Sequence, residues 1–521
     1  MFLGLDSSTQ SLTAIVLDPA TAGVVAECRI GFGQDLPQFG SPSGFLPDGE
    51  EGEVHANPLM WLAALDLLMD RLRQVCDVSK IKAVAGSGQQ HGSVYLNQSF
   101  ETVIGALDAS RDLENQLVGC FSRATSPIWM DTSTGQECKE IAAAAGGDAM
   151  VCQISGSVAV ERFTGPQIRK FFKRENQAYE GTSSIHLVGS FMASVLVGKS
   201  ANIDFGDGAG MNLMDLASGD WSDVLLDATA PELRGKLPAL ASATTVLGVI
   251  SPYFVKRYGF DPDCKCALFT GDNPASLVGM GATEPGNIVI SLGTSDTFFA
   301  AMESAKTDLN GYGHVFGNPA GGFMSLICFR NGSLAREALR DELGLDWSAF
   351  EASALAVTRD SAGENLMLPF YGPEITPRFD FKRPVVRTVH GADGGLPASL
   401  QVRALLEGQF LNMRLHSKWM DVPVRKIRLT GGASQNDGIA GLVADVFQAP
   451  VERLVTGNSA ALGAAMIAAA SQGLEFSTLE RDFSIASGPV IHPDRSLAST
   501  YERAQNRFAE LLRDVMDAGT A

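Results

Sequence analysis

The sequence predicts an α/β protein with two large domains. Three observations support this prediction: a length of 521 residues, a β-hairpin pattern that occurs twice, and strand-like stretches that alternate with helix-like ones. One hydrophobic core stops growing at about 250–300 residues, so a chain of this length is expected to divide into two domains. Strands that alternate with helices along the chain are typical of α/β domains.

The first hairpin opens the chain. Residues 2–5 form a short apolar run, residues 6–11 a polar turn, and residues 12–18 a second run rich in β-formers. The pattern returns at residues 287–290, where a Thr-bearing polar turn leads into the apolar residues 298–300. Two such hairpins, far apart in the chain, indicate a duplicated domain, although hairpins are common and the pattern alone leaves duplication open.

Further elements follow from local patterns. Residues 59–75 have apolar positions at helical spacing, and residues 81–85 predict a short strand before a glycine-rich turn. Turn-forming residues gather over residues 237–263, and we place the domain boundary there, near residue 255. The predicted domains therefore comprise residues 1–255 and residues 256–521.

The second domain repeats the order strand, turn, helix. Residues 266–269 predict a buried strand that ends in the polar residues 270–274, with a helix expected from Ala275. Residues 427–430 predict a further strand, which runs into a glycine-rich turn and then a helix. This order is the one from which α/β domains are built.

Composition and charge argue against several classes of function. A hydrophobic share of 45% and a charged share of 19% fit a globular protein, and a net charge of −19 opposes binding to nucleic acid. The apolar residues 185–197 and 460–470 are too short to cross a bilayer, and the small residues of the second stretch suit close helix packing. The first residues contain no basic leader, so we expect a cytoplasmic protein. We also expect a monomer or homodimer without a membrane or nucleic-acid partner.

Several familiar motifs are incomplete. The eight cysteines contain no C-x-x-C pair, so reduced buried thiols are expected rather than a zinc site. A phosphate-binding P-loop ending at residues 198–200 would need glycine where Ala193 stands. A dinucleotide fingerprint starting at Gly86 would need glycine in place of His91, and no G-x-S-x-G elbow is evident around the candidate nucleophilic serines.

Four polar turns follow predicted strands, at residues 6–9, 270–274, 293–297 and 431–436. Ligands of α/β sheets collect at the carboxyl ends of strands, and small residues let backbone N–H groups approach a phosphate. Two turns carry a carboxylate, Asp6 and Asp272, and a kinase needs carboxylates to hold Mg²⁺ and to accept a proton. A single Asp in a turn is more often a helix cap or an Asx-turn, so the set of four turns carries the inference.

Eight motifs occur in one order between residue 4 and the last quarter of the chain. They are GLDSSTQS at 4–11, GSGQQHGSVY at 86–95, PIWMDTST at 127–134, ERFTGPQI at 161–168, DGAGMNLMD at 207–215, FTGDNPASLVGMG at 269–281, ISLGTSDT at 290–297 and TGGASQN at 430–436. Through these motifs the chain resembles the FGGY family of carbohydrate kinases, and within it most closely the xylulokinases of animals.

The resemblance implies a fold and an activity. The family has two ribonuclease H-like domains of the actin-type ATPase fold, with an active-site cleft between them. The first domain would bind the sugar and carry a phosphate turn, and the second would bind the nucleotide. The implied reaction is ATP-dependent phosphorylation of a small keto-pentose, D-xylulose, to D-xylulose 5-phosphate, with ATP and Mg²⁺.

The resemblance also implies roles for individual residues. Asp272 matches the general base, and Asp6 matches the carboxylate near the metal and the γ-phosphate. The expected sugar contacts are His91, Arg162, Asp272, Asn273, Gln90, Trp129 and Asp131. The expected ATP contacts are Thr9, Gln10, Ser11, Gly293, Thr294, Trp347, Gly431, Gly432, Gln435 and Asn436.

Several of these residues would also fit purely structural roles. His91 could be a structural histidine, Arg162 an ion-pair partner, Trp347 a core residue, and Trp129 with Asp131 a buried tryptophan beside a helix cap. The substrate could be a different sugar or polyol, such as ribulose, gluconate or glycerol. A non-enzymatic ATP-driven switch on the same fold is the alternative from another class, but a switch has no use for a histidine and an arginine on the sugar side.

Overall fold

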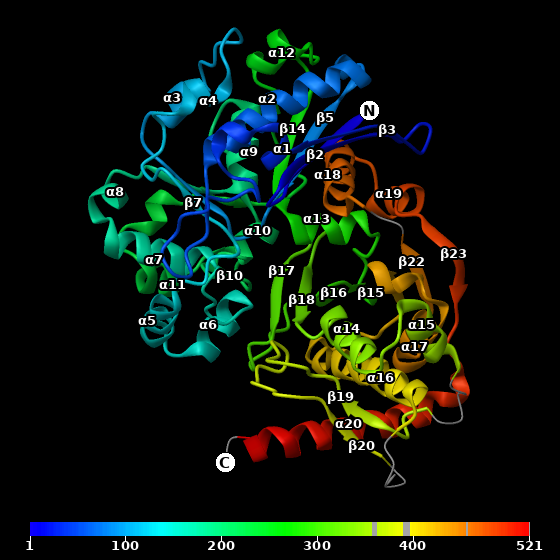
Figure 1. Ribbon diagram of the computed structural model, residues 1–521. Coiled ribbons are helices and arrows are strands. Elements are labelled where there is room, and N and C mark those ends of the chain that lie inside the picture. The colour runs from blue at the N-terminus through cyan, green and yellow to red at the C-terminus, as the bar shows by residue number, and fades with distance from the viewer. Residues whose placement is uncertain (357–361, 389–395, 455–456, 520–521) are drawn as a thin grey trace. The chain divides into compact units, whose positions relative to one another are not determined.

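The computed structural model describes residues 1–356, 362–388, 396–454 and 457–519, and the chain folds into two compact units (Figure 1). Unit 1 comprises Met1–Thr283, Val315–Met324 and Gly457–Ser484. Unit 2 comprises Glu284–His314, Ser325–Thr456 and Ile485–Ala521. The boundary that we placed near residue 255 lies inside unit 1, because the strand that follows it pairs within the first sheet.

Unit 1 is built on a six-stranded sheet with the order β13-β14-β5-β1-β2-β3. Strand β1 pairs antiparallel with β2 and parallel with β5, and β5 pairs parallel with β14. The strands are β1 (Phe2–Ser7), β2 (Ser11–Asp18), β3 (Gly23–Gly31), β5 (Ala83–Gly88), β13 (Val246–Val249) and β14 (Lys265–Gly271).

Unit 2 contains most of a seven-stranded sheet with the order β17-β18-β16-β15-β21-β22-β23. Strand β15 pairs antiparallel with β16 and parallel with β21, and β21 pairs parallel with β22. The order β2-β1-β5-β14 in unit 1 therefore recurs as β16-β15-β21-β22, which is the repeat that the two hairpins predicted. The strands are β15 (Asn287–Leu292), β16 (Asp296–Met302), β17 (Gly313–Gly317), β18 (Phe323–Phe329), β21 (Lys426–Thr430), β22 (Val451–Leu454) and β23 (Ala486–Ile491).

Helices cover both faces of the sheet in unit 1. The principal ones are α2 (Pro58–Val75), α9 (Val188–Val197), α13 (Asp272–Gly279) and α18 (Ser459–Ala470). Side chains of β1 alternate between the two faces, so Leu3 shares a core with Trp61 of α2, whereas Phe2 shares another with Ala461 of α18. The predicted helix over 59–75 is confirmed as α2, which begins after Asn57, whose Oδ1 accepts a hydrogen bond from Leu59 N.

Two predicted boundaries shift by a few residues. Strand β5 begins at Ala83 rather than at residue 81, and α13 begins at Asp272 rather than at Ala275. The second shift matters, because Asp272 becomes the first residue of a helix that follows β14 directly. Its carboxyl therefore lies at the carboxyl end of the sheet and at a helix N-terminus, where backbone N–H groups point toward negative charge.

The remaining elements surround these sheets. In unit 1 the helices are α1 (Phe32–Asp35), α3 (Phe100–Ile104), α4 (Leu113–Leu117), α5 (Gly135–Ala145), α6 (Asp148–Ser155), α7 (Thr164–Arg174), α8 (Asn176–Glu180), α10 (Phe205–Ala209), α11 (Asp223–Thr229), α12 (Pro252–Tyr258) and α19 (Phe476–Phe483). Its short paired strands are β4 (His55–Ala56) with β7 (Ser126–Pro127), β6 (Ser93–Leu96) with β8 (Ser184–Leu187), β9 (Ile203–Asp204) with β12 (Leu240–Ala241), and β10 (Met214–Asp215) with β11 (Asp220–Trp221). Unit 2 adds α14 (Ser333–Glu342), α15 (Trp347–Ala356), α16 (Ala398–His416), α17 (Asp437–Phe447), α20 (Ala498–Gly519) and the strand pair β19 (Leu366–Leu368) with β20 (Val385–Arg387). Within the four described ranges, no helix has both the length and the apolar character needed to cross a membrane.

Helix α18 is packed against its neighbours at backbone distance. A Cβ atom on Gly4 of β1 would lie 2.2 Å from Ala461 O, and one on Gly279 of α13 would lie 2.0 Å from Ser459 O. On α18 itself, a Cβ on Gly463 would lie 1.8 Å from Ala275 O. The close helix packing that the small residues predicted is therefore confirmed, and it brings a late segment of the chain onto the first strand.

Replacement of Gly463 by alanine should destabilise the protein, since the added methyl group must push α18 and α13 apart. We expect the free energy of unfolding to fall by at least about 1–3 kcal/mol, which lowers the thermal midpoint by several degrees. Gly441 in α17 is a matched helical control, because a Cβ there meets no atom within 4 Å. Gly441→Ala should leave the midpoint unchanged or raise it, since alanine favours a helix by about 1 kcal/mol over glycine. Equal midpoints for the two variants in circular dichroism melts would contradict this account.

Candidate active site

Polar side chains gather where β1, β5 and β14 end. The parallel register places Asp6 opposite Ser87, and Ser87 opposite Thr270. Because parallel strands end at the same edge of a sheet, Asp272 at the start of α13 joins this row. The Ser87 hydroxyl donates a hydrogen bond of 2.8 Å to Asp6 Oδ1.

The two carboxyls of this row have raised pKa values. Burial and the nearby charge of Asp272 raise the pKa of Asp6 to about 7, against a smaller opposing effect of the Ser87 hydrogen bond. Burial raises the pKa of Asp272 to about 6, against the opposing effect of backbone N–H groups at Gln90 and Asn273. A carboxyl with a pKa near neutrality can both take up and release a proton at physiological pH, which is the property of a general base.

Gln90 and Asn273 hold the Asp272 carboxyl in place. Asp272 Oδ1 accepts hydrogen bonds from Asn273 N at 2.8 Å, Asn273 Nδ2 at 3.0 Å and Gln90 N at 3.4 Å. The Asn273 amide also donates to Gln90 Oε1 at 2.7 Å. These contacts bring three of the predicted sugar residues together around one carboxyl.

His91 lies next to this group and has a constrained conformation. Its φ angle of 71° is uncommon for a residue with a side chain, and its ring stacks on Phe163 with centroids 4.3 Å apart. Its Nδ1 lies 2.8 Å from Gly210 O, and because a carbonyl only accepts, Nδ1 carries the proton and Nε2 is left as an acceptor. Burial and the charge of Arg162 lower the pKa of His91 to about 3, so the ring is neutral.

Arg162 and Trp129 lie on neighbouring segments of unit 1. The Arg162 guanidinium carbon is 5.6 Å from the centroid of the Phe163 ring, which is the ring that stacks on His91. Trp129 is 46% exposed, and its Nε1 donates to Thr9 Oγ1 at 2.8 Å. The tryptophan is therefore tied to the first hairpin turn rather than to the core.

That hairpin turn holds the predicted residues Thr9, Gln10 and Ser11 of unit 1. Its backbone is fixed from outside, since Gln10 O accepts a hydrogen bond from Phe32 N at 2.9 Å. Gly44 lies directly against the turn with a φ angle of 85°, and a Cβ there would lie 1.8 Å from Thr9 O. Only glycine fits such a position, so the turn is held in one shape.

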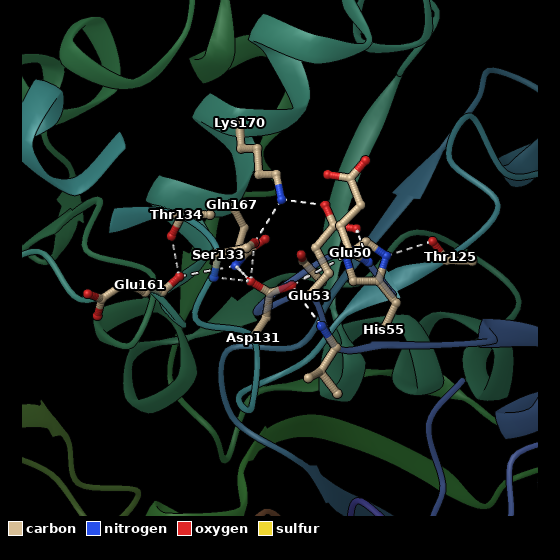
Figure 2. Close-up of polar contacts among 12 residues, drawn as sticks. Glu50, Glu53, His55, Thr125, Asp131, Ser133, Thr134, Glu161, Gln167 and Lys170 are labelled. Carbon is tan, nitrogen blue, oxygen red and sulfur yellow. Dashed lines mark hydrogen bonds and ion pairs between the residues drawn. The ribbon is translucent and has the colours of Figure 1, made fainter. Parts of the chain in front are cut away.

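Asp131 occupies the centre of a buried network rather than an open position (Figure 2). Its Oδ1 accepts hydrogen bonds from Ser133 N at 2.9 Å, Ser133 Oγ at 2.6 Å and Gln167 Nε2 at 2.8 Å. Its Oδ2 accepts one from Val54 N at 3.0 Å and lies 3.5 Å from His55 Nε2. Burial alone would raise the pKa of Asp131, but the contacts with His55, Ser133 and Gln167 lower it below its usual range. With both oxygens engaged, Asp131 is suited to position the loop that carries Trp129 rather than to contact a sugar.

Lys170 extends the same network toward the surface (Figure 2). Its ammonium group donates to the Glu53 carboxylate and to Ser133 Oγ, the latter at 2.8 Å. The network thus joins the β4 region, the loop after β7 and helix α7, and α7 begins directly after Arg162 and Phe163. The contacts of Asp131 with Val54, His55 and Gln167, and that of Lys170 with Glu53, had no signal in the sequence, because these partners come from separate segments.

Unit 2 contains a pocket of about 330 Å³ beside its own hairpin turn. Four residues predicted to contact ATP line it, namely Gly293, Thr294, Gly432 and Trp347. Trp347 is 42% exposed, and the Arg340 guanidinium carbon lies 4.5 Å from the centroid of its ring, so it is a pocket wall rather than a core residue. The other lining residues are Leu292, Ser333, Arg336, Phe350, Glu351, Ala433 and Ile439.

Three further predicted ATP residues border this pocket without lining it. Gly431 has a φ angle of 91°, and a Cβ there would lie 2.3 Å from Leu292 O, so a glycine is required where β21 meets β15. Asn436 caps α17, since its Oδ1 accepts a hydrogen bond from Ile439 N at 3.0 Å. Gln435 is exposed beside it.

A buried ion pair beneath the pocket was missed by the sequence reasoning. Arg336 donates to Asp296 Oδ2 at 3.0 Å and to Asp296 Oδ1 at 2.9 Å, and each residue is 1% exposed. The same guanidinium donates to Gly293 O at 3.2 Å, which fixes the hairpin turn of unit 2. Asp296 lies in a motif that we singled out, but Arg336 comes from a separate helix with no pattern that marks it.

The residues present fit a magnesium ion bound through few protein ligands. Asp6 offers a carboxylate whose negative charge is disfavoured by burial and by Asp272, so a nearby dication would stabilise it. In the described parts of the chain, no group of three or more His, Cys, Asp or Glu side chains is arranged around a common metal position. Mg²⁺ is usually held by one or two carboxylates together with water and substrate phosphates, and Asp6 matches that requirement.

Comparison with known proteins agrees with this geometry. Models of the FGGY family of carbohydrate kinases match the chain, the N-terminal domain at residues 124–279 and the C-terminal domain at residues 288–472. The xylulose kinase of Rattus norvegicus is 39% identical over 533 aligned residues, which cover 99% of this chain and 97% of the relative. Xylulose kinase 2 of Arabidopsis thaliana is 41% identical, covering 90% of this chain and 87% of the relative. The structure of a xylulose kinase from Rhodospirillum rubrum has the same fold, with a TM-score of 0.82 at 21% identity over 99% of this chain and 98% of that one.

The burial of Asp6 predicts that Asp6→Asn stabilises the protein when nucleotide, metal and sugar are absent. The folded-state pKa of about 7 exceeds the ordinary value of 3.8, so ionisation of Asp6 destabilises the folded state. The free energy of unfolding of the variant should exceed that of the wild type by about 1–3 kcal/mol at pH 8. This difference should shrink as the pH falls below 7 and vanish near pH 4. Denaturant titrations at several pH values measure it, and a difference that does not depend on pH would contradict the assigned cause.

Proposed function

The chain belongs to the FGGY family of carbohydrate kinases, and we propose that it transfers the γ-phosphoryl group of ATP to a hydroxyl of D-xylulose, giving D-xylulose 5-phosphate. The sugar is supported by relatives named xylulose kinase that match the chain over nearly its full length. The observation that carries the proposal is the partly buried Asp272 carboxyl, held by backbone N–H groups at the end of β14 with a pKa of about 6.

In the proposed reaction Asp272 is the general base. It takes the proton from O5 of the sugar as that oxygen attacks the γ-phosphorus, and the bond from the γ-phosphorus to the bridging oxygen breaks with its electron pair leaving on ADP. The raised pKa of Asp272 suits this step, because the carboxyl is ionised at neutral pH yet basic enough to hold a proton. Gln90 and Asn273 keep the accepting oxygen in one position.

Three side chains are proposed to hold the sugar. His91 would accept a hydrogen bond at Nε2 from a sugar hydroxyl, since Gly210 O fixes the proton on Nδ1. Arg162 supplies N–H donors for a keto oxygen or for hydroxyl oxygens. Asn273 would accept from a sugar hydroxyl at Oδ1, since its Nδ2 already donates to Gln90 Oε1 and Asp272 Oδ1. Trp129 would border the site through its contact with Thr9, and Asp131 would act on the sugar indirectly through the loop it anchors.

The nucleotide is proposed to bind in the unit 2 pocket. Its adenine would lie against Trp347, and the backbone at Gly431 and Gly432 would approach the adenosine closely. Backbone N–H groups and hydroxyls of the turns at residues 6–11 and 293–297 would donate to the phosphates. Asp6 would hold the Mg²⁺ of MgATP, which neutralises phosphate charge. No disulfide joins the eight cysteines within the described residues, which supports the proposed reducing, cytoplasmic location.

The test is coupled ADP release with MgATP against D-xylulose, L-xylulose, D-ribulose, L-ribulose, gluconate, glycerol and no sugar. We expect a selective response to D-xylulose, and Asp272→Asn should lower kcat by about 10²–10⁴-fold without lowering the thermal midpoint. As the pH falls below about 6, kcat/KM of the wild type should fall as Asp272 takes up its proton. ADP release that ignores every sugar would refute the kinase assignment, and near-wild-type turnover of Asp272→Asn would refute the base.

The nucleotide site predicts a separate effect of Trp347. Truncation to alanine removes the proposed stacking surface for adenine, so KM for ATP should rise by about 5- to 100-fold while KM for the sugar stays the same. Trp347→Phe keeps an aromatic face, so it should raise KM for ATP by a smaller factor than Trp347→Ala. If steady-state kinetics give all three proteins the same KM for ATP, adenine binds elsewhere.

A further inference from the structure

Helix α10 lies between two residues of the proposed sugar site. Gly206 O accepts a hydrogen bond from Gln90 Nε2 at 3.4 Å, and Gly210 O lies 2.8 Å from His91 Nδ1. Asp207 stands between these two anchors, so its backbone position is fixed relative to Gln90 and His91. The segment belongs to the motif DGAGMNLMD, none of whose residues is among the predicted sugar or ATP contacts.

The capping of α10 is complete without Asp207. Asp204 Oδ1 accepts a hydrogen bond from Asp207 N at 2.8 Å, and Asp204 Oδ2 accepts others from Gly206 N at 2.9 Å and Thr270 Oγ1 at 2.8 Å. Asp204 therefore has a structural role that accounts for both of its oxygens. The side chain of Asp207 has no such role in the helix.

The Asp207 carboxyl is buried with an unmade hydrogen bond. It is 2% exposed, and across the four described ranges of the chain its Oδ1 has no hydrogen-bond partner. The buried carboxyl of Asp66 is different, since Tyr253 and Tyr258 donate to its Oδ1 and Leu113 N donates to its Oδ2. A buried polar group without a partner destabilises a fold, so Asp207 Oδ1 is available to a hydrogen-bond donor that enters the site.

The surroundings of Asp207 place it beside the reacting carboxyl. A Cβ on Gly189 of α9 would lie 3.4 Å from Asp207 Oδ2 and 3.0 Å from Thr270 O, so the carboxyl lies close to the end of β14. Asp272 follows that end directly. Burial, the charge of Asp204 and the charge of Asp272 raise the pKa of Asp207, so Asp204 and Asp272 are the charged groups that act on it.

We propose that Asp207 is a further substrate-binding residue, whose carboxyl takes its missing hydrogen bond from a non-reacting hydroxyl of the bound sugar. The inference rests on the proposed function. A polyhydroxylated substrate brings several donors to the site, and a buried oxygen that lacks a partner gains a hydrogen bond from one of them. A site built around such a contact rejects an analogue that lacks the hydroxyl, because the buried oxygen is then left unpaired. Asp207 would therefore help to select the sugar.

The first test compares Asp207→Asn with the matched control Asp66→Asn. Asp207→Asn should raise KM for D-xylulose by about 10- to 100-fold, leave KM for ATP unchanged and keep the thermal midpoint, because within the described residues Asp207 Oδ1 has no hydrogen bond to lose. Asp66→Asn disturbs a fully bonded carboxyl of similar burial, so it should lower the midpoint and leave KM for the sugar as it was. An Asp207→Asn enzyme with the wild-type KM for D-xylulose would overturn the inference.

The second test identifies the hydroxyl. The substrates are D-xylulose and its 1-deoxy, 3-deoxy and 4-deoxy analogues. For one analogue, the fall in kcat/KM relative to D-xylulose should be much larger in the wild type than in Asp207→Asn. If both proteins show equal losses for all three analogues, Asp207 does not contact the sugar. Failure of the proposed function would look different, since the wild type itself would then release ADP no faster with any sugar.

Discussion

The candidate site depends on the register of three parallel strands. The pairing of β1 with β5 and of β5 with β14 aligns Asp6, Ser87 and Thr270, and α13 starts immediately afterwards with Asp272. A slip of one residue between β1 and β5 would turn Asp6 to the opposite face of the sheet. The hydrophobic cores on both faces oppose such a slip, because they require the alternation of Phe2 with Leu3. Packing of apolar side chains thus fixes the positions of Asp6 and Asp272 relative to each other.

Five carboxyls of unit 1, those of Asp66, Asp131, Asp204, Asp207 and Asp272, fall into two kinds. Asp66, Asp131 and Asp204 have hydrogen bonds to both oxygens, and they join separate segments of the chain. Asp272 is bonded only through Oδ1, and Asp207 Oδ1 is unpaired within the described residues. A carboxyl group with an oxygen that lacks a hydrogen bond lowers the stability of the fold, and such groups are common at functional sites. Asp207 and Asp272 thus differ from the three supporting carboxyls in keeping an oxygen that no described residue binds.

Local sequence patterns predicted the parts of the fold that depend on neighbours in the chain. The two hairpins, helix α2 and the strand before Asp272 all follow from short runs of residues. The family resemblance, not a local pattern, pointed to Gly293 and Trp347, which line the pocket of unit 2. The missed features are pairings between distant segments. Arg336 and Asp296 meet from different elements, and the network around Asp131 joins three segments. A single boundary near residue 255 does not describe unit 1, because that unit takes Val315–Met324 and Gly457–Ser484 from between the segments of unit 2.

The late position of α18 in the sequence affects how unit 1 folds during synthesis. This helix covers the face of the first sheet that carries Phe2, Ile15 and Leu17, yet it is encoded after most of unit 2. During synthesis from the N-terminus, this apolar face remains uncovered until residues 459–470 have left the ribosome and can form α18. Until then the growing chain exposes a surface that attracts other apolar segments. The order of translation therefore makes completion of the first unit depend on the emergence of the second, and a fragment that ends before α18 lacks one wall of its own core.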